Sequence, residues 1–251
     1  MRVSIITATY NSEDTLEYCM DSVLNQTYRQ IEYIIVDGGS TDGTLEIIES
    51  KAKKNTQVVW QSQKDKGIYD ALNKGIEKAT GDIVGFVHSD DALKSHDIIE
   101  KIVGLFEQTP IDGVYGNLHY VKYDNPGVIV RNWVSQEFKP SLLNRGWMPA
   151  HPTLFLKKSI YDTYGHFNLD YRIAADYDFI LRVFSQQNLK FAYLPETITI
   201  MRVGGASNRS IANVVRKTKE DFRAAKSNKL SLPIWTISMK NLSKIPQWFK
   251  K

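Results

Sequence analysis

Two adjacent aspartates, Asp90 and Asp91, follow a short apolar run, Ile83–Val87. A strand that is buried on both faces reads as such a continuous run, and aspartate favours the turn that ends it. In open α/β sheets, ligands bind at this edge. Neighbouring carboxylates repel each other unless a cation lies beside them, and Mg²⁺ combines one or two carboxylates with water and phosphate oxygens. The pair therefore predicts a divalent-cation site; the alternative is a cap on the next helix, begun by Ser89 or Asp91.

Two earlier strands are expected to end at the same edge. The run Val3–Thr9 leads into Tyr10 and Asn11, and Ile31–Val36 leads into Asp37 and the glycine-rich segment GGSTDG. A carboxylate at the end of an early strand suits ribose hydroxyls or the N–H of a base, and glycines let the backbone approach a ligand. A plain turn with a helix cap is the alternative for GGSTDG. Neither GxGxxG after the first strand nor GxxxxGK[ST] is present, which excludes both common phosphate loops.

Helical spacing of apolar residues separates these strands from one another and from a third, Val58–Gln61. We therefore expect an α/β fold with a Rossmann-like, mostly parallel sheet and helices on both faces. After residue 93 the pattern changes, and a smaller antiparallel portion is expected. Its predicted strands are Gly113–Tyr123, Val128–Val134, Thr153–Leu156, Leu189–Tyr193 and Thr197–Met201. A helix is predicted to begin at Asp176, which in that case could simply be its N-cap.

Composition limits the class of protein. The 251 residues are 42% hydrophobic and 24% charged, no apolar run reaches the roughly 20 residues of a membrane span, and Cys19 is the only cysteine. These features favour a cytoplasmic enzyme, and a peripheral position on the inner face of the cell membrane is left open. Residues 1–208 carry a net charge of −5, whereas residues 209–251 carry +9 and include Trp235, Trp248 and Phe249. The tail is either a membrane-surface segment or a solvated basic helix. The acidic body disfavours nucleic acid.

Over roughly residues 1–205, the chain resembles family 2 glycosyltransferases with the GT-A fold. Five segments in the same order carry the resemblance: SIITATYNSEDTLEYCMDSVLNQTY, IEYIIVDGGSTDGT, DKGIYDALNKGIEKATGD, IVGFVHSDD and AADYDFILR. The variant KGIYDALNKGI is similar to bacterial enzymes that build capsule, O-antigen or exopolysaccharide units of the colanic-acid type. The implied organisation is a GT-A domain over 1–208, with a nucleotide-binding half (1–93) and an acceptor-side half (94–208), followed by a basic helical tail (209–251).

The resemblance also implies roles for individual residues. Asp37 would bond the base, commonly uracil; Asp90 would face the ribose and sugar, and Asp91 would bind Mn²⁺ or Mg²⁺. Asp176 would be the catalytic base, and His151 would contact donor or acceptor unless it is a core histidine. The residues implied in nucleotide-sugar binding are Thr7, Ala8, Thr9, Tyr10, Asn11, Asp37, Gly38, Lys66, Gly67, Asp70, Asn73, Ser89 and Asp90.

Departures from the family pattern refine these expectations. Many relatives have an arginine where Asp70–Asn73 stands, so Lys66 is expected to compensate the phosphates, and Ala175 replaces the glutamate that usually precedes the base. The absence of QxxRW argues against a processive synthase. We expect an inverting, non-processive transferase that moves a sugar from a nucleotide-diphosphate sugar, commonly a UDP-sugar, to a saccharide or lipid-linked acceptor. A homodimer is left open.

Two other functions remain as alternatives. A sugar nucleotidyltransferase would need a glycine-rich basic signature after the first strand, and TATYNSEDT has no basic residue. A non-catalytic nucleotide-sugar-binding protein would bind the donor without releasing UDP.

Overall fold

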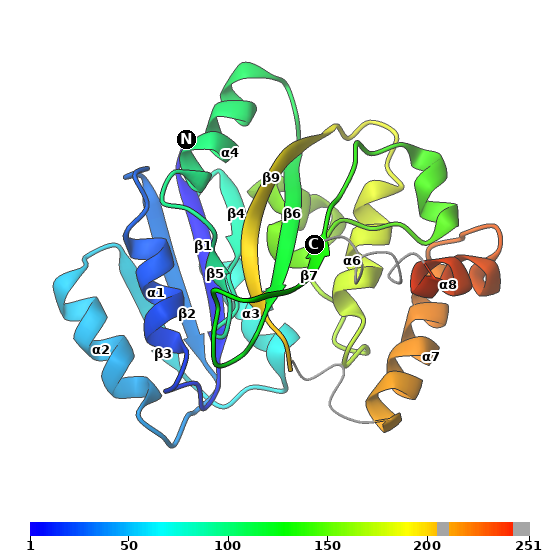
Figure 1. Ribbon diagram of the computed structural model, residues 1–251. Helices are drawn as coiled ribbons and strands as arrows, with labels where there is room; N and C mark the ends of the chain where they lie inside the picture. The colour runs from blue at the N-terminus through cyan, green and yellow to red at the C-terminus, as the bar shows by residue number, and fades with distance from the viewer. Residues whose placement is uncertain (205–210, 243–251) are drawn as a thin grey trace.

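A computed structural model describes residues 1–204 and 211–242. In its N-terminal half, strands and helices alternate along the chain (Figure 1). These elements are β1 (Val3–Thr9), α1 (Leu16–Leu24), β2 (Ile31–Asp37), α2 (Thr44–Lys54), β3 (Val58–Ser62), α3 (Ile68–Lys78) and β4 (Ile83–Phe86). β1 pairs in parallel with both β2 and β4, and β2 pairs in parallel with β3. The predicted parallel half is therefore confirmed, and its strands end at one edge.

The second half extends the same sheet with strands of both directions. Its elements are β5 (Ala92–Leu93), α4 (Ile98–Gln108), β6 (Gly113–Val121), β7 (Ile129–Trp133), η1 (Pro140–Arg145), η2 (His151–Thr153), β8 (Phe155–Lys157), α5 (Lys158–Tyr164), α6 (Ala175–Phe184), β9 (Phe191–Arg202), α7 (Ile211–Ser227) and α8 (Pro233–Leu242). In the described part of the chain the strand order is β3-β2-β1-β4-β8-β6-β9-β5, with β7 on β6. β8 lies antiparallel between β4 and β6 and joins the halves.

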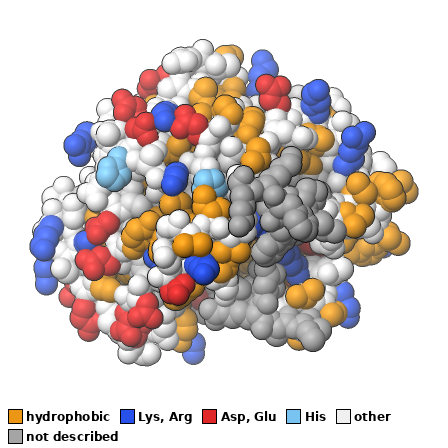
Figure 2. Space-filling view, in the orientation of Figure 1, with side chains coloured by type: hydrophobic (Ala, Val, Ile, Leu, Met, Phe, Trp, Pro, Cys, Tyr) orange, Lys and Arg blue, Asp and Glu red, His pale blue; other side chains and the backbone are white. Residues whose placement is uncertain are grey.

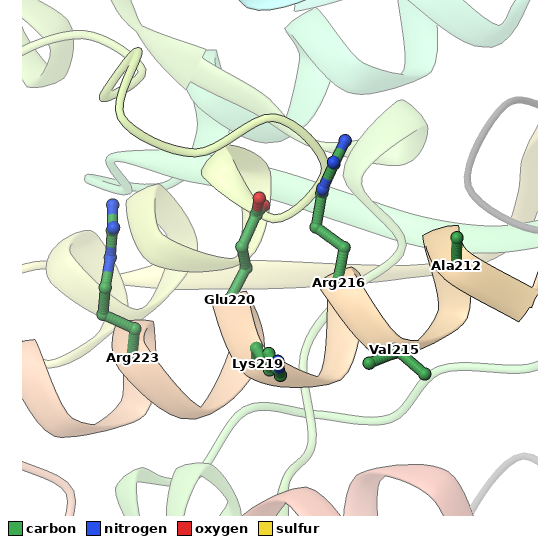
Figure 3. Close-up of a pocket in the computed structure, with 6 residues that line it drawn as sticks. All are labelled: Ala212, Val215, Arg216, Lys219, Glu220 and Arg223. Atoms are coloured by element: carbon green, nitrogen blue, oxygen red, sulfur yellow. The ribbon is translucent and has the colours of Figure 1, made fainter.

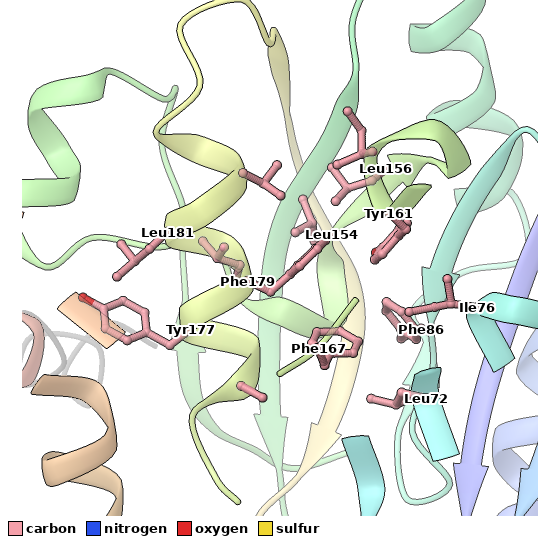
Figure 4. Packing of buried hydrophobic residues seen from close by; sticks show 14 of the residues in the cluster. Leu72, Ile76, Phe86, Leu154, Leu156, Tyr161, Phe167, Tyr177, Phe179 and Leu181 are labelled. Carbon is pink, nitrogen blue, oxygen red and sulfur yellow. The ribbon is translucent and has the colours of Figure 1, made fainter. Parts of the chain in front are cut away.

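Two hydrophobic cores cover the two faces of the sheet. Residues of β1 alternate between them: Ile5 packs with α1 and α4, whereas Ile6 packs with α3, α5 and α6. Figure 4 shows the core on the face covered by α3, α5 and α6, in which Phe86 of β4 approaches Phe167 and α6. Gly85 is required here, because a Cβ at this position would lie 2.1 Å from the Phe155 ring. The helix faces predicted from apolar spacing therefore bury both sides of the sheet.

Several predicted boundaries were wrong. The strand predicted at Thr153–Leu156 begins only at Phe155, because residues 151–153 form a 3-10 turn that contains Pro152. The two last predicted strands are one strand, β9, whose pairing with β6 shifts around Pro195, since proline has no N–H for the ladder. Helix α6 begins at Ala175 with Ala174 as its N-cap, so Asp176 is not the cap.

The basic tail also differs from the prediction. Instead of one helix it forms α7 and α8, and both pack on the body of the protein (Figure 1). The predicted loop around residues 205–208 and the aromatic residues Trp248 and Phe249 lie outside the described residues. Within 1–204 and 211–242, no helix combines the length and hydropathy needed to cross a bilayer.

Candidate active site

A cleft of about 1170 Å³ opens at the carboxyl ends of β1 and β4. Its walls come from the loops after these strands, from α3 and α6, from the β6–β7 hairpin, and from α7 and α8. Of the residues predicted for the site, the cleft lining includes Ala8, Tyr10, Asn11, Ser89, Asp90, His151 and Asp176. The expected convergence of strand ends therefore holds for the loops after β1 and β4.

The loop after β4 is built to hold Asp90 and Asp91 in fixed positions. The Thr7 hydroxyl donates to the Val87 carbonyl (2.6 Å), and the Asp91 N–H donates to the His88 carbonyl (2.9 Å), which closes a turn. The Ser89 and Ser12 hydroxyls lie 2.9 Å apart, so this loop is tied to the one after β1. Asp90 consequently faces the cleft, while Asp91 is buried next to it.

Asp91 is a buried carboxylate without a well-formed hydrogen bond in the described chain. It is 1% exposed, and neither side-chain oxygen has a hydrogen-bond partner. Burial and the neighbouring Asp90 raise the pKa of Asp91 well above its usual range, against the opposing effects of the Arg202 backbone N–H and of the Arg202 cation. An unsatisfied buried carboxylate destabilises a protein unless a cation or proton compensates it. Asp91 therefore fits a metal ligand.

The cation that fits is one that takes few protein ligands. Among the described residues, no group of three or more histidine, cysteine, aspartate or glutamate side chains could enclose a metal. Mg²⁺ and Mn²⁺ suit one or two carboxylates together with water and phosphate oxygens. The residues present thus match a cation shared with a phosphate-bearing ligand rather than a structural metal.

Asp37 is in a different state from Asp91, although it is equally buried. Its Oδ2 accepts hydrogen bonds from the Gly39 and Ser40 N–H groups (both 3.0 Å) and from the Ser62 hydroxyl (2.6 Å). Its Oδ1 accepts from the Ser40 hydroxyl. The carboxylate therefore shapes the loop after β2, and the cleft lining includes neither Asp37 nor Gly38. Its contact with a base stays a prediction.

The predicted threonines of β1 also lie behind the cleft. Thr7 is fully buried, and its hydroxyl lies 3.0 Å from that of Tyr33. Thr9 is 3% exposed, and its hydroxyl has no partner among the described residues. Thr7 thus holds the loop after β4, whereas Thr9 keeps a free hydroxyl at the strand end.

The predicted residues Lys66, Gly67, Asp70 and Asn73 are not part of the cleft lining, although their neighbours Ile68, Tyr69 and Leu72 are. Gly67 has a φ of +120° and precedes α3, and the Asp70 carboxylate accepts the Lys66 N–H and pairs with Lys74, both at 3.0 Å. The Asn73 amide bonds both backbone groups of Phe167, at 2.9 and 3.0 Å. These residues fix the start of α3 and tie it to the loop before α6. The Lys66 side chain is exposed.

Asp176 stands in the first turn of α6, where an anion is favoured, and it faces the cleft. The Tyr69 hydroxyl lies 3.1 Å from its Oδ1 and 2.7 Å from the Ile173 carbonyl. Tyr69 therefore anchors one oxygen of the carboxylate. The arrangement leaves Asp176 able to accept a proton from a hydroxyl in the cleft.

The His151 side chain forms part of the cleft wall and is uncharged. It is 7% exposed, its ring stacks on Phe86 with centroids 5.3 Å apart, and the His88 ring lies 5.8 Å away. Burial lowers the pKa of His151 to about 4, so the ring is neutral at physiological pH. Its Nε2 has no partner within the described chain. Burial likewise lowers the pKa of His88.

The structure identifies one contributor that the sequence pattern did not reveal. The Glu220 carboxylate of α7 accepts the consecutive N–H groups of Arg172, Ile173 and Ala174, with shortest distances of 3.1, 2.8 and 3.0 Å. Figure 3 shows Glu220 pointing from α7 towards this segment. These N–H groups precede α6, so Glu220 holds the loop that leads into Asp176. More than 40 residues separate the partners, and no local motif links them.

Aromatic side chains line the cleft wall formed by the β6–β7 hairpin and the segment after η1. Trp133 and Tyr120 come from the β6–β7 hairpin, and the Arg131 guanidinium lies 4.7 Å from the Tyr120 ring centroid and 5.6 Å from that of Trp133. Trp147 follows η1 and stacks on Phe138 (5.6 Å). Aromatic faces of this kind suit the apolar faces of sugar rings. Sequence reasoning missed them, because aromatics in strands are ordinarily core residues.

Comparison with known proteins identifies the family. The family model described as Glycosyl transferase family 2 matches residues 4–169. The chain belongs to glycosyltransferase family 2. It is 34% identical over 212 residues to a PGL/p-HBAD biosynthesis glycosyltransferase of Mycobacterium tuberculosis. The aligned residues are 82% of this chain and 78% of the relative. An uncharacterized glycosyltransferase of the same species is 34% identical over 184 residues, 72% of this chain and 68% of that one. The chain is therefore a glycosyltransferase.

Solved structures show the same fold. S. aureus TarS 1–349 in complex with UDP-GlcNAc aligns with a TM-score of 0.69 at 19% identity, over 99% of this chain and 78% of that chain. The mannosyltransferase PcManGT from Pyrobaculum calidifontis, in complex with GDP-Man and Mn²⁺, aligns with a TM-score of 0.67 at 19% identity, over 99% and 73%. The expected GT-A fold is thereby confirmed.

Proposed function

We propose that the protein transfers a sugar from a UDP-sugar to a saccharide or lipid-linked saccharide in bacterial surface polysaccharide biosynthesis, with inversion at the anomeric carbon. The observation that carries the proposal is the unsatisfied, buried carboxylate of Asp91 beside a cleft that also holds Asp176. Support comes from structural neighbours in complex with UDP and UDP-GlcNAc. A relative named for PGL/p-HBAD biosynthesis supports a role in glycan assembly.

Asp91 would hold Mn²⁺ or Mg²⁺, and Asp90 would face the ribose and sugar. When bound, the cation compensates the charge that develops on the diphosphate leaving group. Tyr10 and Asn11 line the cleft beside this position and would contact the nucleotide. Burial of Asp91 keeps its carboxylate away from competing water and from the acceptor.

Asp176 would act as the catalytic base. The acceptor hydroxyl transfers its proton to the carboxylate as its oxygen bonds to the anomeric carbon, and the bond from that carbon to the diphosphate oxygen breaks. One displacement of this kind inverts the configuration, so an α-linked donor gives a β-linked product. The hydrogen bond from Tyr69 fixes the orientation of the carboxylate before the acceptor arrives.

The acceptor would bind along the aromatic wall. Tyr120, Trp133 and Trp147 line the cleft on the side of the β6–β7 hairpin and η1. Their rings offer flat apolar surfaces for sugar faces, while His151 closes the floor as a neutral group. The donor would then meet the acceptor near Asp176.

The test is a transfer assay with a panel of UDP-sugars, Mn²⁺ and oligosaccharide acceptors, read as UDP release and as the anomeric configuration of the product by NMR. We expect inverted product, and we expect Asp176→Asn to lower kcat by about 10² to 10⁴ while Mn²⁺-dependent UDP binding is retained. Asp170→Asn, the same change at an exposed position before α6, is the matched control. Wild-type transfer by Asp176→Asn, or a product of retained configuration, would overturn the mechanism.

A further inference from the structure

Helix α8 presents an apolar face to solvent. Four large apolar side chains of this region are more than half exposed: Leu232 (64%), Ile234 (73%), Trp235 (56%) and Leu242 (55%). At 100° per residue, Ile234, Trp235 and Leu242 share one side of the helix. Thr236, Ile237 and Lys240 occupy the other side and are buried. Figure 2 shows hydrophobic side chains gathered at the right edge of the molecule, where α8 lies in Figure 1. We call Leu232, Ile234, Trp235 and Leu242 the α8 face.

Helix α8 is firmly attached to the body, so the α8 face has a fixed position. The Lys240 ammonium pairs with Asp221 of α7 at 2.9 Å, with both side chains at most 5% exposed. The Thr236 hydroxyl donates to the Asn144 carbonyl (3.1 Å). Gly146, with a φ of +72°, allows close approach, because a Cβ there would lie 2.3 Å from the Thr236 carbonyl oxygen. The apolar residues are therefore exposed by the fold and not by fraying of the helix.

Charge indicates what covers this face. Asp221 is the last acidic residue of the sequence, and residues 222–251 contain seven Lys or Arg and no Asp or Glu. Lys226 and Lys229 are exposed at the junction of α7 and α8. Apolar side chains that include a tryptophan, next to exposed lysines in a stretch of sequence without acidic residues, match the interface of an anionic bilayer. A second copy of this chain would bring like charges together.

The α8 face is also close to the cleft. Lys240 on the inner side of α8 and Lys217 on α7 line the same cleft as Asp176. A bilayer against the outer side of α8 would therefore lie beside the acceptor end of the cleft. The Lys240 ammonium is already held by Asp221, whereas the Lys217 ammonium in the cleft lining suits a phosphate.

We propose that the α8 face docks the enzyme on an anionic membrane surface and that the acceptor saccharide is presented from that membrane on a lipid phosphate. The docking part stands on the surface alone, whereas the acceptor part rests on the proposed transferase function. Lipid binding is carried by the apolar residues, and the surrounding lysines select anionic headgroups.

The test is co-sedimentation of the full chain with vesicles of phosphatidylcholine alone or with one quarter phosphatidylglycerol. We expect about tenfold or tighter binding to the anionic vesicles, lost progressively with salt, and a further tenfold or greater loss in the double variant Ile234→Ser, Trp235→Ser. The control is Val59→Ser with Ile129→Ser, which removes two exposed apolar side chains from β3 and β7. This control should bind like the wild type.

Absence of vesicle binding, equal binding to both vesicle types, or equal loss in the control would overturn the proposal. So would a dimer in sedimentation velocity that dissociates in the Ile234→Ser, Trp235→Ser variant and does not bind vesicles. Mn²⁺-dependent UDP binding, measured without vesicles, should be the same in all variants. It reports on the donor site, so failure of the transferase function and failure of membrane docking are separate results.

Discussion

The end of β2 and the loop after β4 carry the same chemical group in two opposite states. Asp37 and Asp91 are both buried aspartates near the carboxyl edge of the parallel strands. Asp37 accepts four hydrogen bonds from its own loop and from Ser62, whereas neither Asp91 oxygen has a partner within the described residues. Burial alone therefore does not identify a ligand site. What distinguishes a structural carboxylate from a ligand-binding one is whether the protein itself supplies its hydrogen bonds.

The same comparison sorts the carboxylates of the second half. Glu220 resembles Asp37, because its oxygens accept the consecutive N–H groups before α6. Asp176 is intermediate between these two states, because it accepts a hydrogen bond from Tyr69 and also has access to the cleft. Carboxylates of the first kind are expected to matter for stability and positioning, and those of the second kind for ligand binding and chemistry.

Asp91→Asn should give the largest loss of function. Removing the charge that would hold the cation is expected to lower transfer by about 10³-fold or more, since charge compensation of the leaving group is lost. Mn²⁺-dependent UDP binding, followed by calorimetric titration, should disappear with it. Unchanged UDP affinity in the presence of Mn²⁺ would show that Asp91 is not the ligand.

The same substitution, Asp91→Asn, should not lower the stability of the metal-free protein, although it lowers activity. Because folding raises the pKa of Asp91, the metal-free protein loses stability as the pH rises from the ordinary aspartate pKa of about 4 towards that raised value. Asp91→Asn should remove this loss, so its metal-free melting temperature at neutral pH should equal or exceed that of the wild type. A clearly lower melting temperature would mean that the protein already satisfies Asp91.

Asp37→Ala should behave oppositely. It leaves the Gly39 and Ser40 N–H groups and the Ser62 hydroxyl without their acceptor, which costs about 2–4 kcal/mol. Urea unfolding should show this loss equally with and without Mn²⁺. A variant as stable as the wild type but unable to bind UDP would instead assign Asp37 directly to the base.

Glu220→Gln is expected to have the smallest effect of the set. The amide keeps one acceptor oxygen for the loop before α6, so a kcat about tenfold lower is expected, with KM for the donor unchanged. Lys219→Gln, at the exposed position of α7 that precedes Glu220, is the control. Glu220→Ala should lower kcat further than Glu220→Gln does. If both substitutions raise KM and leave kcat alone, Glu220 does not position Asp176.

The sequence predicted the parallel half well, because its signals are local. Apolar runs and helical spacing located β1 to β4 and the helices between them, and the turn residues after β1 and β4 converge as expected. The state of a carboxylate was not predictable in this way. The partners of Asp37 include Ser62, 25 residues away, and those of Glu220 lie 46 to 48 residues away, so both depend on tertiary packing.

The second half of the chain was harder to predict for the same reason. The break in β9 pairing at Pro195 and the short β8 depend on neighbours that are distant in the chain. Basic composition indicated a tail, but only packing shows that one side of α8 holds the buried Lys240–Asp221 pair while the other exposes Trp235. The individual residues predicted for donor, metal and base roles stay predictions until they are tested.

The most direct test of the central claim is the melting temperature of the wild-type protein with UDP, with Mn²⁺ and with both. A ligand that binds only the folded state stabilises it by RT ln(1 + [L]/Kd). If Asp91 awaits a cation shared with a nucleotide diphosphate, UDP and Mn²⁺ together should raise the melting temperature by more than the sum of their separate effects. No shift with UDP, GDP or any other nucleotide diphosphate, in the presence or absence of Mn²⁺, would contradict the account.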